Sequence, residues 1–353
     1  MRTITIKASK TYDVIIGPGL LKEAGNIIRK KLGGETAAII TDSNVAPLYA
    51  KALADSLALE NYRIEKYVFP HSECSKNAET FLSILNFLAE NKFSRSDIIV
   101  ALGGGVTGDL AGFAAASYMR GIRFVQIPTT VLAAVDSSVG GKTGINLPAG
   151  KNLAGAFYQP GLVLCDTDTF STLPEDVFRD GCAEMIKHGM IADSELFHSY
   201  KTPIHTQLET AIARNIEIKR DIVCADEFES GRRKLLNLGH TAGHAIELLS
   251  GYKTPHGHAV AAGMALITRA AVRLGLCKEA CLTDLLDMLT LYKLPLNTSY
   301  KADELARACL SDKKRDGKSL TMVFPLETGN CILKEVPVSE LEELIRLGLD
   351  GNQ

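Results

Sequence analysis

The sequence lacks the features that would assign it to several large classes of protein. Lys and Arg number 39 against 41 for Asp and Glu, so the net charge of −2 gives no overall attraction to nucleic acid or to a membrane surface. Eight cysteines in 353 residues are too few for a disulfide scaffold, and we expect buried thiols of a reducing compartment. No uncharged apolar run reaches the roughly 18 residues that span a membrane, and the first residues contain no apolar core of a signal peptide. These absences predict a cytoplasmic protein with neither nucleic acid nor membrane as a partner.

What the sequence does contain predicts an α/β domain over residues 1–175. Hydrophobic residues make up 46% of the chain, which is enough for a large core, and 353 residues correspond to about two domains. Short apolar runs alternate with helical stretches such as 46–57 and 77–90, and this alternation is typical of βαβ units. We therefore predict a Rossmann-like domain with a mostly parallel sheet, whose strands cover residues 36–41, 64–69, 97–102, 123–127 and 162–166.

Residues 176–353 have a different character and predict a mainly α-helical C-terminal domain. Apolar positions recur at helical spacing, most clearly over 208–224 and 258–274. A late hairpin is predicted with its turn at Thr328, Gly329 and Asn330, and a last helix over 339–347. Because a cleft between two domains can exclude water from a reaction, we expect the active site in such a cleft.

A glycine-rich segment directly after the strand at 97–102 predicts a nucleotide site. Residues 103–108 read GGGVTG, which matches G-x-G-x-x-G before a helix predicted over 109–117. Glycine lets the backbone approach a pyrophosphate, and a helix N-terminus offers N–H groups to an anion. The alternative is a tight strand-to-helix turn that binds no ligand.

The acidic residue that usually binds the ribose in a Rossmann fold is missing. No Asp or Glu occurs between residues 110 and 135, where it would be expected. Asp42 and Glu73 follow two other predicted strands and could replace it, and Thr129 and Thr130 could supply hydroxyl groups. We therefore expect a dinucleotide bound in a variant manner.

The segment 136–152 is rich in glycine and small polar residues and contains two lysines, Lys142 and Lys151. A lysine in a glycine-rich loop is a usual partner for a phosphate group or an oxyanion. The residues around Lys142 resemble the end of a P-loop, but that motif needs glycine at position 136, where this chain has Asp136. A solvated surface loop is the alternative. Because long ordered loops are often functional, we expect this one to bind an anion.

Four of the eight histidines occur within 19 residues and predict a metal site. His240 and His244 are four residues apart, so both face one side of a helix, and His256 and His258 follow. The site is not of the H-E-x-x-H type, because residue 241 is threonine. Separate packed or solvent-facing imidazoles are the alternative.

A carboxylate must complete the ligand set, because a catalytic zinc ion takes three protein ligands and leaves one position open. Glu184 is the best candidate, since a lone glutamate in an apolar helical stretch is costly unless it is paired or ligated. A helix-surface pair between Glu184 and Lys187 is the alternative. Positive charge is added before the histidines by Lys219, Arg232, Arg233 and Lys234, for which a solvated basic face is the alternative.

Together these features indicate a metal- and NAD-dependent oxidation of an alcohol on a sugar phosphate. A bound dinucleotide can accept and return hydride, and a divalent metal ion can polarise an alcohol oxygen and lower its pKa. The cationic residues favour an anionic, phosphorylated small-molecule substrate.

Five motifs occur together and in order: GGGVTGD at 103–109, SYMRG at 117–121, QIPTT at 126–130, DSSVGGKT at 136–143 and NLGHTAGHA at 237–245. As a set they closely resemble the 3-dehydroquinate synthase family, which belongs to the sugar-phosphate cyclases. The resemblance covers nearly the whole chain and is highly specific.

The resemblance implies a carbon–oxygen lyase of the shikimate pathway, in aromatic amino acid biosynthesis. The family converts 3-deoxy-D-arabino-heptulosonate 7-phosphate to 3-dehydroquinate and phosphate. A transient NAD-dependent oxidation is followed by β-elimination of phosphate, re-reduction and an intramolecular aldol closure. The alternatives are another sugar-phosphate cyclase, such as 2-deoxy-scyllo-inosose synthase, or a polyol dehydrogenase of the glycerol-dehydrogenase type.

The resemblance also implies roles for particular residues. Zinc, with cobalt as the alternative metal, is held by Glu184, His240 and His256. Arg120 reaches the site of a partner subunit, which implies a homodimer, and Lys314 rather than Lys313 reaches the substrate. The catalytic residues are Asp136, Lys142, Lys187, Lys219, Arg233, Asn237 and His244, and Asn152 binds substrate with Arg120 and Lys314. The NAD contacts are Asp42, Asn44, Glu73, Lys76, Gly104, Gly105, Val106, Thr107, Gly108, Asp109, Thr129, Thr130, Lys142, Lys151, Thr169, Phe170, Ser171 and Thr172.

Two segments depart from the family pattern. Residues 256–258 read HGH where His-Gly-Glu is usual, and the match implies that His256 binds the metal while His258 is a second contact or a bystander. Residues 71–76 read HSECSK where Asp-Gly-Glu-Lys-x-Lys is common, but the spacing of Glu73 and Lys76 is kept.

Overall fold

A computed structural model describes residues 1–312 and 318–349, so Lys313 and Lys314 lie outside the described residues. The chain divides into two compact units. The first contains residues 1–174 and 219–228, and the second contains residues 175–218 and those from 229 onward. None of the described helices combines the length and the apolar character that crossing a membrane requires.

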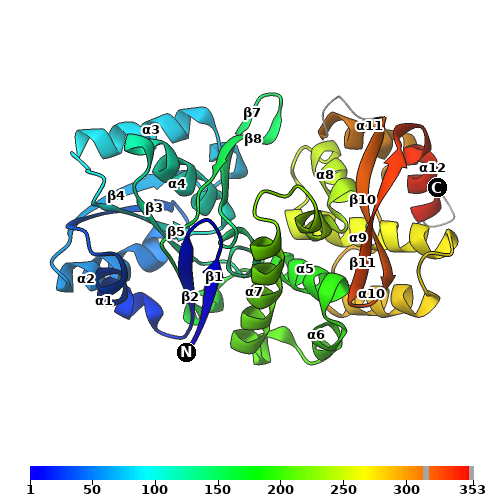
Figure 1. Cartoon of the computed structure of the whole chain (residues 1–353), viewed down its shortest axis with the longest axis horizontal. Helices are drawn as coiled ribbons and strands as arrows, with labels where there is room; N and C mark the ends of the chain where they lie inside the picture. Colours follow the sequence, from blue (N-terminus) through cyan, green and yellow to red (C-terminus); the bar gives the residue numbers. More distant parts are fainter. Residues whose placement is uncertain (313–317, 350–353) are drawn as a thin grey trace. The chain divides into compact units, whose positions relative to one another are not determined.

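The first unit is built on a seven-stranded sheet with the order β1-β2-β9-β6-β5-β3-β4 (Figure 1). All neighbouring strands are parallel except β1 and β2, which form an antiparallel pair. The predicted mostly parallel sheet is therefore confirmed. The strands are β1 (Arg2–Lys7), β2 (Thr11–Gly17), β3 (Thr36–Asp42), β4 (Arg63–Phe69), β5 (Ile98–Gly103), β6 (Arg123–Pro128) and β9 (Leu162–Asp166).

Helices cover both faces of this sheet, because successive residues of its strands point to opposite faces. Ala37 and Ile39 of β3 pack with helices α1 and α2, whereas Ala38 and Ile40 pack with α3 and α4. Burial on both faces explains why the central strands are almost continuously apolar. The helical segments are α1 (Leu20–Leu32), η1 (Ala46–Ala50), α2 (Lys51–Leu59), η2 (Glu73–Ser75), α3 (Ala78–Glu90), α4 (Gly105–Ser117), η3 (Tyr118–Arg120), η4 (Ala133–Ser137) and η5 (Thr167–Thr172).

The strand order creates a switch point between β3 and β5. The chain passes from β3 outward to β4 and then returns to the other side of β3 as β5. In open α/β sheets, ligands bind in the crevice that forms beyond the carboxyl ends of two such strands. Asp42 ends β3 and the glycine-rich segment follows β5, so both lie at this crevice.

Two expectations about local structure are wrong. The segment 136–152 is not a long loop, because most of it forms the hairpin of β7 (Lys142–Leu147) and β8 (Gly150–Phe157). Glycines allow this close pairing, since a Cβ at Gly155 would lie only 2.1 Å from the carbonyl oxygen of Thr143. In addition, α4 begins at Gly105 rather than at 109, so most of the glycine motif forms the first turn of the helix.

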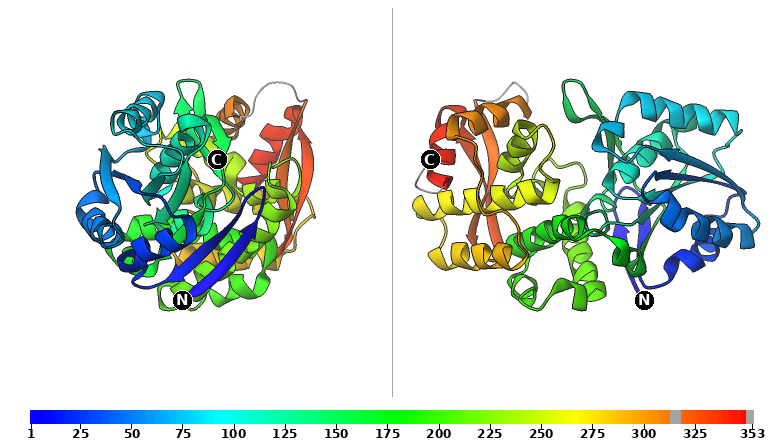
Figure 2. Two further views of the ribbon diagram at one scale, coloured as in Figure 1. Left: turned by 60° about the vertical axis from the view of Figure 1, so that its left-hand side comes forward. Right: turned by 180° about the vertical axis from the view of Figure 1, so that it is seen from behind.

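The second unit is mainly helical, as predicted, with one antiparallel hairpin (Figure 2). Its central helix is α9, which contacts α5, α8, α10, α12 and strand β10. The elements are α5 (Glu175–Ala192), α6 (Ser194–Ser199), η6 (Ile204–Thr206), α7 (Leu208–Ala225, whose last residues belong to the first unit), η7 (Arg232–Asn237), α8 (His240–Leu249), α9 (His256–Arg273), α10 (Glu279–Leu291), α11 (Ala302–Asp312), β10 (Ser319–Glu327), β11 (Asn330–Pro337), η8 (Val338–Glu340) and α12 (Leu341–Gly348).

Glycines bring α8 and α9 into backbone contact. A Cβ at Gly263 would lie 2.1 Å from the carbonyl oxygen of Gly239, and a Cβ at Gly243 would lie 3.1 Å from the backbone of Val260. Gly239 also has a φ of 79°, in the left-handed region that favours glycine. The glycines of the NLGHTAGHA motif therefore set the distance between the two helices that carry the histidines.

The cysteines are all free thiols, and six of the eight are buried. Cys74 and Cys224 are exposed, so the expectation of buried thiols is wrong for these two. They lie at surface positions, in η2 and in the last turn of α7.

Candidate active site

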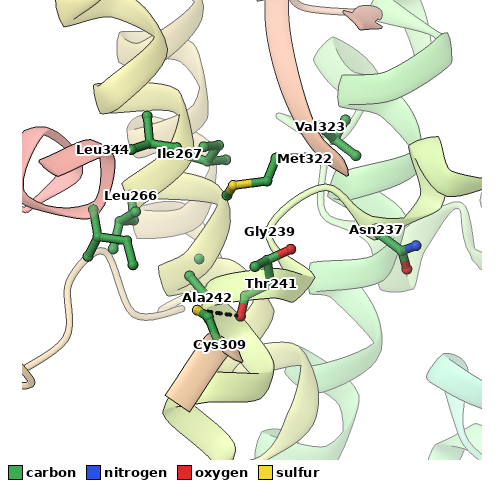
Figure 3. Close-up of a pocket in the computed structure, with 12 residues that line it drawn as sticks. Asn237, Gly239, Thr241, Ala242, Leu266, Ile267, Cys309, Met322, Val323 and Leu344 are labelled. Carbon is green, nitrogen blue, oxygen red and sulfur yellow. Dashed lines mark hydrogen bonds between the residues drawn. The ribbon is translucent and has the colours of Figure 1, made fainter. Parts of the chain in front are cut away.

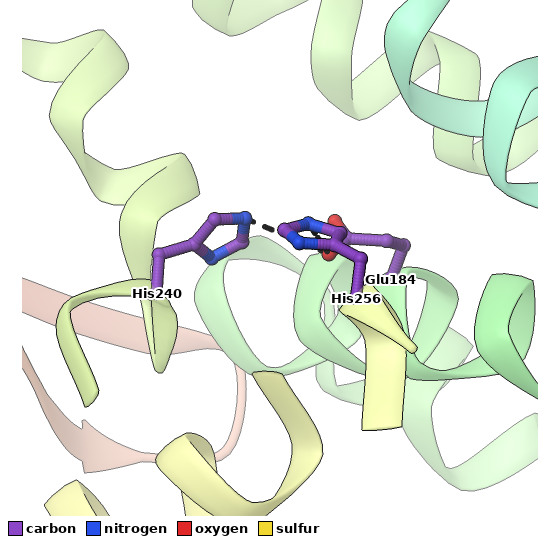
Figure 4. Close-up of side chains that lie close together, drawn as sticks. All are labelled: Glu184, His240 and His256. Carbon is purple, nitrogen blue, oxygen red and sulfur yellow. Dashed lines mark ion pairs between the residues drawn. The ribbon is translucent and has the colours of Figure 1, made fainter. Parts of the chain in front are cut away.

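Three side chains from different helices meet inside the second unit (Figure 4). Glu184 lies on α5 and is completely buried, His240 begins α8, and His256 begins α9. Oε1 of Glu184 lies 3.7 Å from Nε2 of His240 and 3.7 Å from Nε2 of His256. The structure thus brings together the three residues expected to hold the metal ion.

The spacing of these atoms suits a metal ion better than it suits hydrogen bonds. A distance of 3.7 Å exceeds the usual range of a nitrogen–oxygen hydrogen bond, and Oε1 of Glu184 is buried without a hydrogen-bond partner among the described residues. Around a tetrahedral zinc ion with bonds of about 2.1 Å, neighbouring ligand atoms lie about 3.4 Å apart. The donor set, one carboxylate oxygen and two imidazole nitrogens, is also one that zinc accepts.

Each of the three side chains is held through its other polar atom. Oε2 of Glu184 accepts a hydrogen bond from the buried ammonium group of Lys187, so only Oε1 remains for a metal ion. Nδ1 of His240 lies 3.2 Å from the carbonyl oxygen of Leu238, and Nδ1 of His256 lies 3.2 Å from Oε2 of Glu247. The pair of Glu184 with Lys187, considered as the alternative to a metal ligand, exists, but it is buried and does not lie on the helix surface.

The two imidazoles experience different electrostatic surroundings. Burial, with the positive charge of Lys187, holds the pKa of His240 well below its usual value. Burial also acts to lower the pKa of His256, but the carboxylates of Glu247, Glu184 and Asp180 outweigh it and raise that pKa to about 8. The negative charge around His256 therefore favours a cation at this position.

His244 and His258 lie in different environments. The ring of His244 has its centroid 5.5 Å from that of His240 and 5.8 Å from that of His256, so His244 borders the three side chains. His258 instead faces Asp180, whose Oδ1 lies 3.0 Å from the backbone nitrogen and 3.2 Å from Nδ1 of His258. Among the described residues, His258 belongs to no group with metal-ligand spacing.

In the first unit, the crevice between β3 and β5 contains the predicted nucleotide residues. Oδ1 of Asp42 accepts the backbone N–H groups of Asn44 at 2.8 Å and Val45 at 3.0 Å. Oδ2 lies 3.4 Å from the hydroxyl of Thr107, in the first turn of α4. Asp42 therefore joins the end of β3 to the helix that follows β5.

The surroundings of the glycine motif are narrow and polar. A Cβ at Gly104 would lie 3.2 Å from Cγ2 of Thr130, and one at Gly105 would lie 3.3 Å from the hydroxyl of Ser137. Within the described chain, the buried hydroxyls of Thr129 and Ser137 have no hydrogen-bond partner. Such hydroxyls beside a helix N-terminus fit the phosphate groups of a dinucleotide.

A second polar network in this unit is centred on Lys76, which is 5% exposed. Its Nζ pairs with the carboxylate of Asp109 and donates to Oδ1 of Asn152 at 2.5 Å. Burial raises the pKa of the Asp109 carboxyl, and the charge of Lys76 opposes that shift. Nζ of Lys151 lies 3.8 Å from Oε1 of Glu73. Asn146 connects Glu73 to the predicted substrate residue Asn152, because it donates to Oε1 of Glu73 at 2.8 Å and accepts the backbone N–H of Asn152 at 2.9 Å.

The remaining predicted residues are placed individually. Lys219, which is 5% exposed, pairs with Asp136 inside the first unit, and Arg233 in the second unit is only 1% exposed. The alternative of a solvated basic face is therefore wrong for these two residues. The residues Thr169 and Thr172 contact the hydroxyl of Tyr49. Lys142 and Arg120 are exposed, at the start of β7 and in η3, and Gly108, Val106, Phe170 and Ser171 lie in α4 and η5.

Two glutamates near the site were not selected from the sequence. Glu229 accepts a hydrogen bond from the predicted residue Asn237 at 3.0 Å, and its φ of 62° lies in the left-handed region. Glu247 lies seven residues after His240 on α8, a spacing that returns to the same helix face. That spacing was the available signal for Glu247, whereas backbone strain at Glu229 is not visible in a sequence.

A small apolar cavity lies beside the metal-ligand residues (Figure 3). Its volume is about 10 Å³, near the lower limit of the space that one water molecule needs. Leu266, Ile267, Met322 and Leu344 line it, with Asn237 at one side. We interpret it as a packing gap, and no ligand is assigned to it.

Comparison with solved structures identifies the fold. The fold is that of structurally known sugar-phosphate cyclases. A crystal structure of 2-deoxy-scyllo-inosose synthase complexed with carbaglucose-6-phosphate, NAD+ and Co2+ matches with a TM-score of 0.88 and 28% identity, over 99% of this chain and 100% of that one. The 2-epi-5-epi-valiolone synthase of Streptomyces hygroscopicus, with NAD+ and Zn2+ bound, matches with a TM-score of 0.87 and 28% identity, over 99% of both chains.

The sequence comparisons define the family more closely. Residues 66–180 match the family described as 3-dehydroquinate synthase N-terminal, and residues 181–315 match 3-dehydroquinate synthase C-terminal. The protein named 3-dehydroquinate synthase in Streptococcus thermophilus is 42% identical over 342 residues, which cover 95% of this chain and 96% of the relative. The chain belongs to the 3-dehydroquinate synthase family, and the resemblance predicted from the five motifs is confirmed.

Proposed function

We propose that this protein converts 3-deoxy-D-arabino-heptulosonate 7-phosphate to 3-dehydroquinate and phosphate, with NAD+ and a divalent metal ion as cofactors. The observation that carries the proposal is Oε1 of Glu184. In the part of the chain that the structure describes, this buried atom has no hydrogen-bond partner, and it faces one ring nitrogen each of His240 and His256 at 3.7 Å. Because the chain belongs to the 3-dehydroquinate synthase family, we assign that family's reaction to this site. Zinc and cobalt both suit the donor set.

The cofactors supply chemistry that side chains cannot: NAD+ takes up and returns a hydride, and the metal ion polarises an alcohol oxygen. Glu184, His240 and His256 would hold the metal ion, and Lys187, which donates to Oε2 of Glu184, would leave Oε1 to bind it. The first turn of α4 would hold the dinucleotide phosphates through the glycine backbone, with Thr129 and Thr130 beside it. Asp42 and the network around Lys76 would hold the rest of the nucleotide.

Cationic side chains would bind the two anionic groups of the substrate. We assign Arg233 and Lys219 to the carboxylate, because a guanidinium group forms paired hydrogen bonds with a carboxylate. Lys142, Asn152 and His244 are assigned to the phosphate, and Lys314, outside the described residues, to a further substrate contact. Asp136, which pairs with Lys219, and Asn237, which pairs with Glu229, would orient these groups.

The proposed substrate carries a carboxylate, and this feature separates the proposal from its alternatives. Arg233 is almost completely buried, and a buried cation favours an anionic partner. A sugar phosphate without a carboxylate would offer Arg233 no such group to bind. A polyol dehydrogenase would release NADH as a product, whereas the proposed reaction regenerates NAD+ in each turnover.

The test is phosphate release from the heptulosonate phosphate with a catalytic amount of NAD+. We expect phosphate in many-fold excess over NAD+ and no net absorbance of NADH at steady state. Glucose 6-phosphate, which has no carboxylate, should release none. Stoichiometric NADH would instead favour the dehydrogenase, and turnover of glucose 6-phosphate would favour the other cyclase.

We also propose that the enzyme is a homodimer in which Arg120 completes the site of the partner subunit. Met119 and Arg120 have φ angles of 50° and 64°, and consecutive non-glycine residues in the left-handed region are strained, as is often found at functional positions. An Arg120→Ala chain should recover part of its activity when it forms heterodimers with a Glu184→Gln chain. Verified heterodimers without recovery would contradict shared sites. The cytoplasmic location stays a prediction.

A further inference from the structure

Of the two expected histidine ligands, only His256 has its second ring nitrogen held by a side chain. Nδ1 of His256 lies 3.2 Å from Oε2 of Glu247, whereas Nδ1 of His240 lies 3.2 Å from the backbone carbonyl of Leu238. Glu247 is 3% exposed, so its carboxylate is withdrawn from water. A buried carboxylate is retained only where it has partners, and an imidazole N–H is a suitable one.

The helix α8 places Glu247 opposite His256 for a geometric reason. His240, His244 and Glu247 are spaced by four and three residues, so they share one face of α8. The first turn of α9, which begins with His256, packs against this face because glycines allow the two helices to touch. The carboxylate therefore reaches the side of the imidazole that Glu184 and His240 do not face.

His256 belongs to two groups of side chains that have metal-ligand spacing. One group is Glu184, His240 and His256, and the other is His244, Glu247 and His256. The imidazole faces the first group with Nε2 and Glu247 with Nδ1. A neutral imidazole carries one N–H and one lone pair, so the nitrogen that donates a hydrogen bond cannot bind a metal ion.

We propose that Glu247 is a positioning residue, whose carboxylate accepts the Nδ1–H of His256 and so directs the lone pair of Nε2 toward Glu184 and His240. The metal ion then binds in the first group and not between His244 and Glu247. The inference rests on the proposed function only in that a metal ion occupies this site. Partners of this kind typically contribute about 10–100-fold to metal affinity.

Asp180, which lies on α5 and contacts the same first turn of α9, provides a matched control. Its Oδ1 accepts the backbone N–H of His258, and Pro255, the residue before the helix, has no side chain that could do so. Asp180→Asn changes a carboxylate to an amide at the start of α9, as Glu247→Gln does near His256. This variant therefore shows how much affinity is lost when the first turn of α9 is loosened. A larger loss in the Glu247 variants would then come from misorientation of the His256 imidazole.

The experiment measures metal affinity without substrate or NAD+. Wild type, Glu247→Leu, Glu247→Gln and Asp180→Asn are stripped of metal, and their affinity for Zn2+ is measured by competition with a coloured chelator. We expect Glu247→Leu to bind 10–100-fold more weakly. Glu247→Gln should recover most of the affinity, because its amide oxygen can accept the same hydrogen bond, and Asp180→Asn should stay within about threefold of wild type. Nitrogen NMR of the zinc-loaded proteins should show His256 protonated at Nδ1, with Nε2 bound to the metal ion, in wild type and in Glu247→Gln.

Three results would overturn the proposal. Glu247→Leu could retain affinity within twofold, Glu247→Gln could be as weak as Glu247→Leu, or Asp180→Asn could lose as much as Glu247→Leu. If Glu247→Leu does not fold, the NMR spectrum of Glu247→Gln decides, and protonation at Nε2 would exclude the positioning role. Because turnover is not measured, these results are independent of whether the chain releases phosphate from the heptulosonate phosphate.

Discussion

Lys219 donates a hydrogen bond to the carboxylate of Asp136, with 2.6 Å between Nζ and Oδ1, although 83 residues separate them in the sequence. The Lys219 side chain is 6% exposed and that of Asp136 is 23% exposed. Both residues are proposed to act on the substrate. The charge of Lys219 is therefore balanced before any substrate carboxylate arrives, and Asp136 keeps the ammonium group in place.

This pair predicts a measurable coupling in stability. Asp136→Asn and Lys219→Met should each lower the free energy of unfolding, and the double variant should lose less than the sum, with a coupling energy of about 1–3 kcal/mol. Urea unfolding of the four proteins gives this value. The exposed pair Lys51 and Asp55, whose side chains are 86% and 62% exposed, is the control and should couple by less than about 0.5 kcal/mol. Equal coupling in both pairs would contradict the structural role.

His256 and His258 should differ in metal retention. His256→Ala removes one of three ligands and should strip most of the zinc, whereas His258, which faces Asp180, should be dispensable for binding. Zinc content by mass spectrometry after dialysis, measured beside turnover, separates the two. A metal-free His258→Ala with a metal-loaded His256→Ala would require Glu184, His240 and His258 as the ligands.

Substitutions of Lys76 and Lys142 should have different effects, one on NAD+ affinity and the other on turnover. Lys142 is exposed at the start of β7, whereas Lys76 is buried and joins Asp109 to Asn152. Lys142→Ala should lower turnover at least 100-fold and change NAD+ affinity by less than about threefold, because it loses a phosphate contact of the substrate. Lys76→Met should weaken NAD+ binding by 10-fold or more. Isothermal titration checks both, and circular dichroism confirms that each variant is folded.

Opposite results, with NAD+ affinity lost in Lys142→Ala and kept in Lys76→Met, would reassign the two lysines.

Asp97 should stabilise the first unit in a pH-dependent manner. Burial acts to raise the pKa of its carboxyl, but hydrogen bonds from Ser94 and Thr36 outweigh burial and hold the pKa below 3.8. A lowered pKa in the folded state means that the stabilisation is present above pH ~4 and is lost as the pH falls through the folded-state value. Asp97→Asn should therefore lose about 1–2 kcal/mol at pH 7, and the difference from wild type should shrink below pH 4. A difference that does not depend on pH would contradict this origin.

The strands of the first unit could be predicted because burial on both faces makes them continuous apolar runs. The strand β9 at Leu162–Asp166 was predicted with the bounds that the structure has, and β3 at Thr36–Asp42 differs by one residue. The strands β7 and β8 were missed because Gly144 and Gly155 pair closely across the hairpin, and such a glycine-rich segment has the composition of a loop. The signal that identified the central sheet is absent there.

For the site, sequence motifs led to residues but not to the partners that hold them. Glu184 stood out as a charge in an apolar stretch, and His240 and His256 belong to a recognisable motif and its neighbour. The pairing of Lys219 with Asp136 and of Glu247 with His256 depends on contacts between separate segments, which local patterns do not encode. The sequence therefore predicts which residues form the site. The orientation and protonation of each side chain can be inferred only from the folded structure.

The glycine contact between α8 and α9 has a consequence for how this protein can change over evolution. Most helix pairs adjust to mutation by repacking the side chains between them. Here the backbones of the two helices meet at Gly239, Gly243 and Gly263, and these residues have no side chain that could repack. A side chain gained at Gly243 or Gly263 would force the two helices apart instead of being absorbed between them. The separation of His240 and His256 is therefore more sensitive to substitution at these three positions than to drift in the surrounding core.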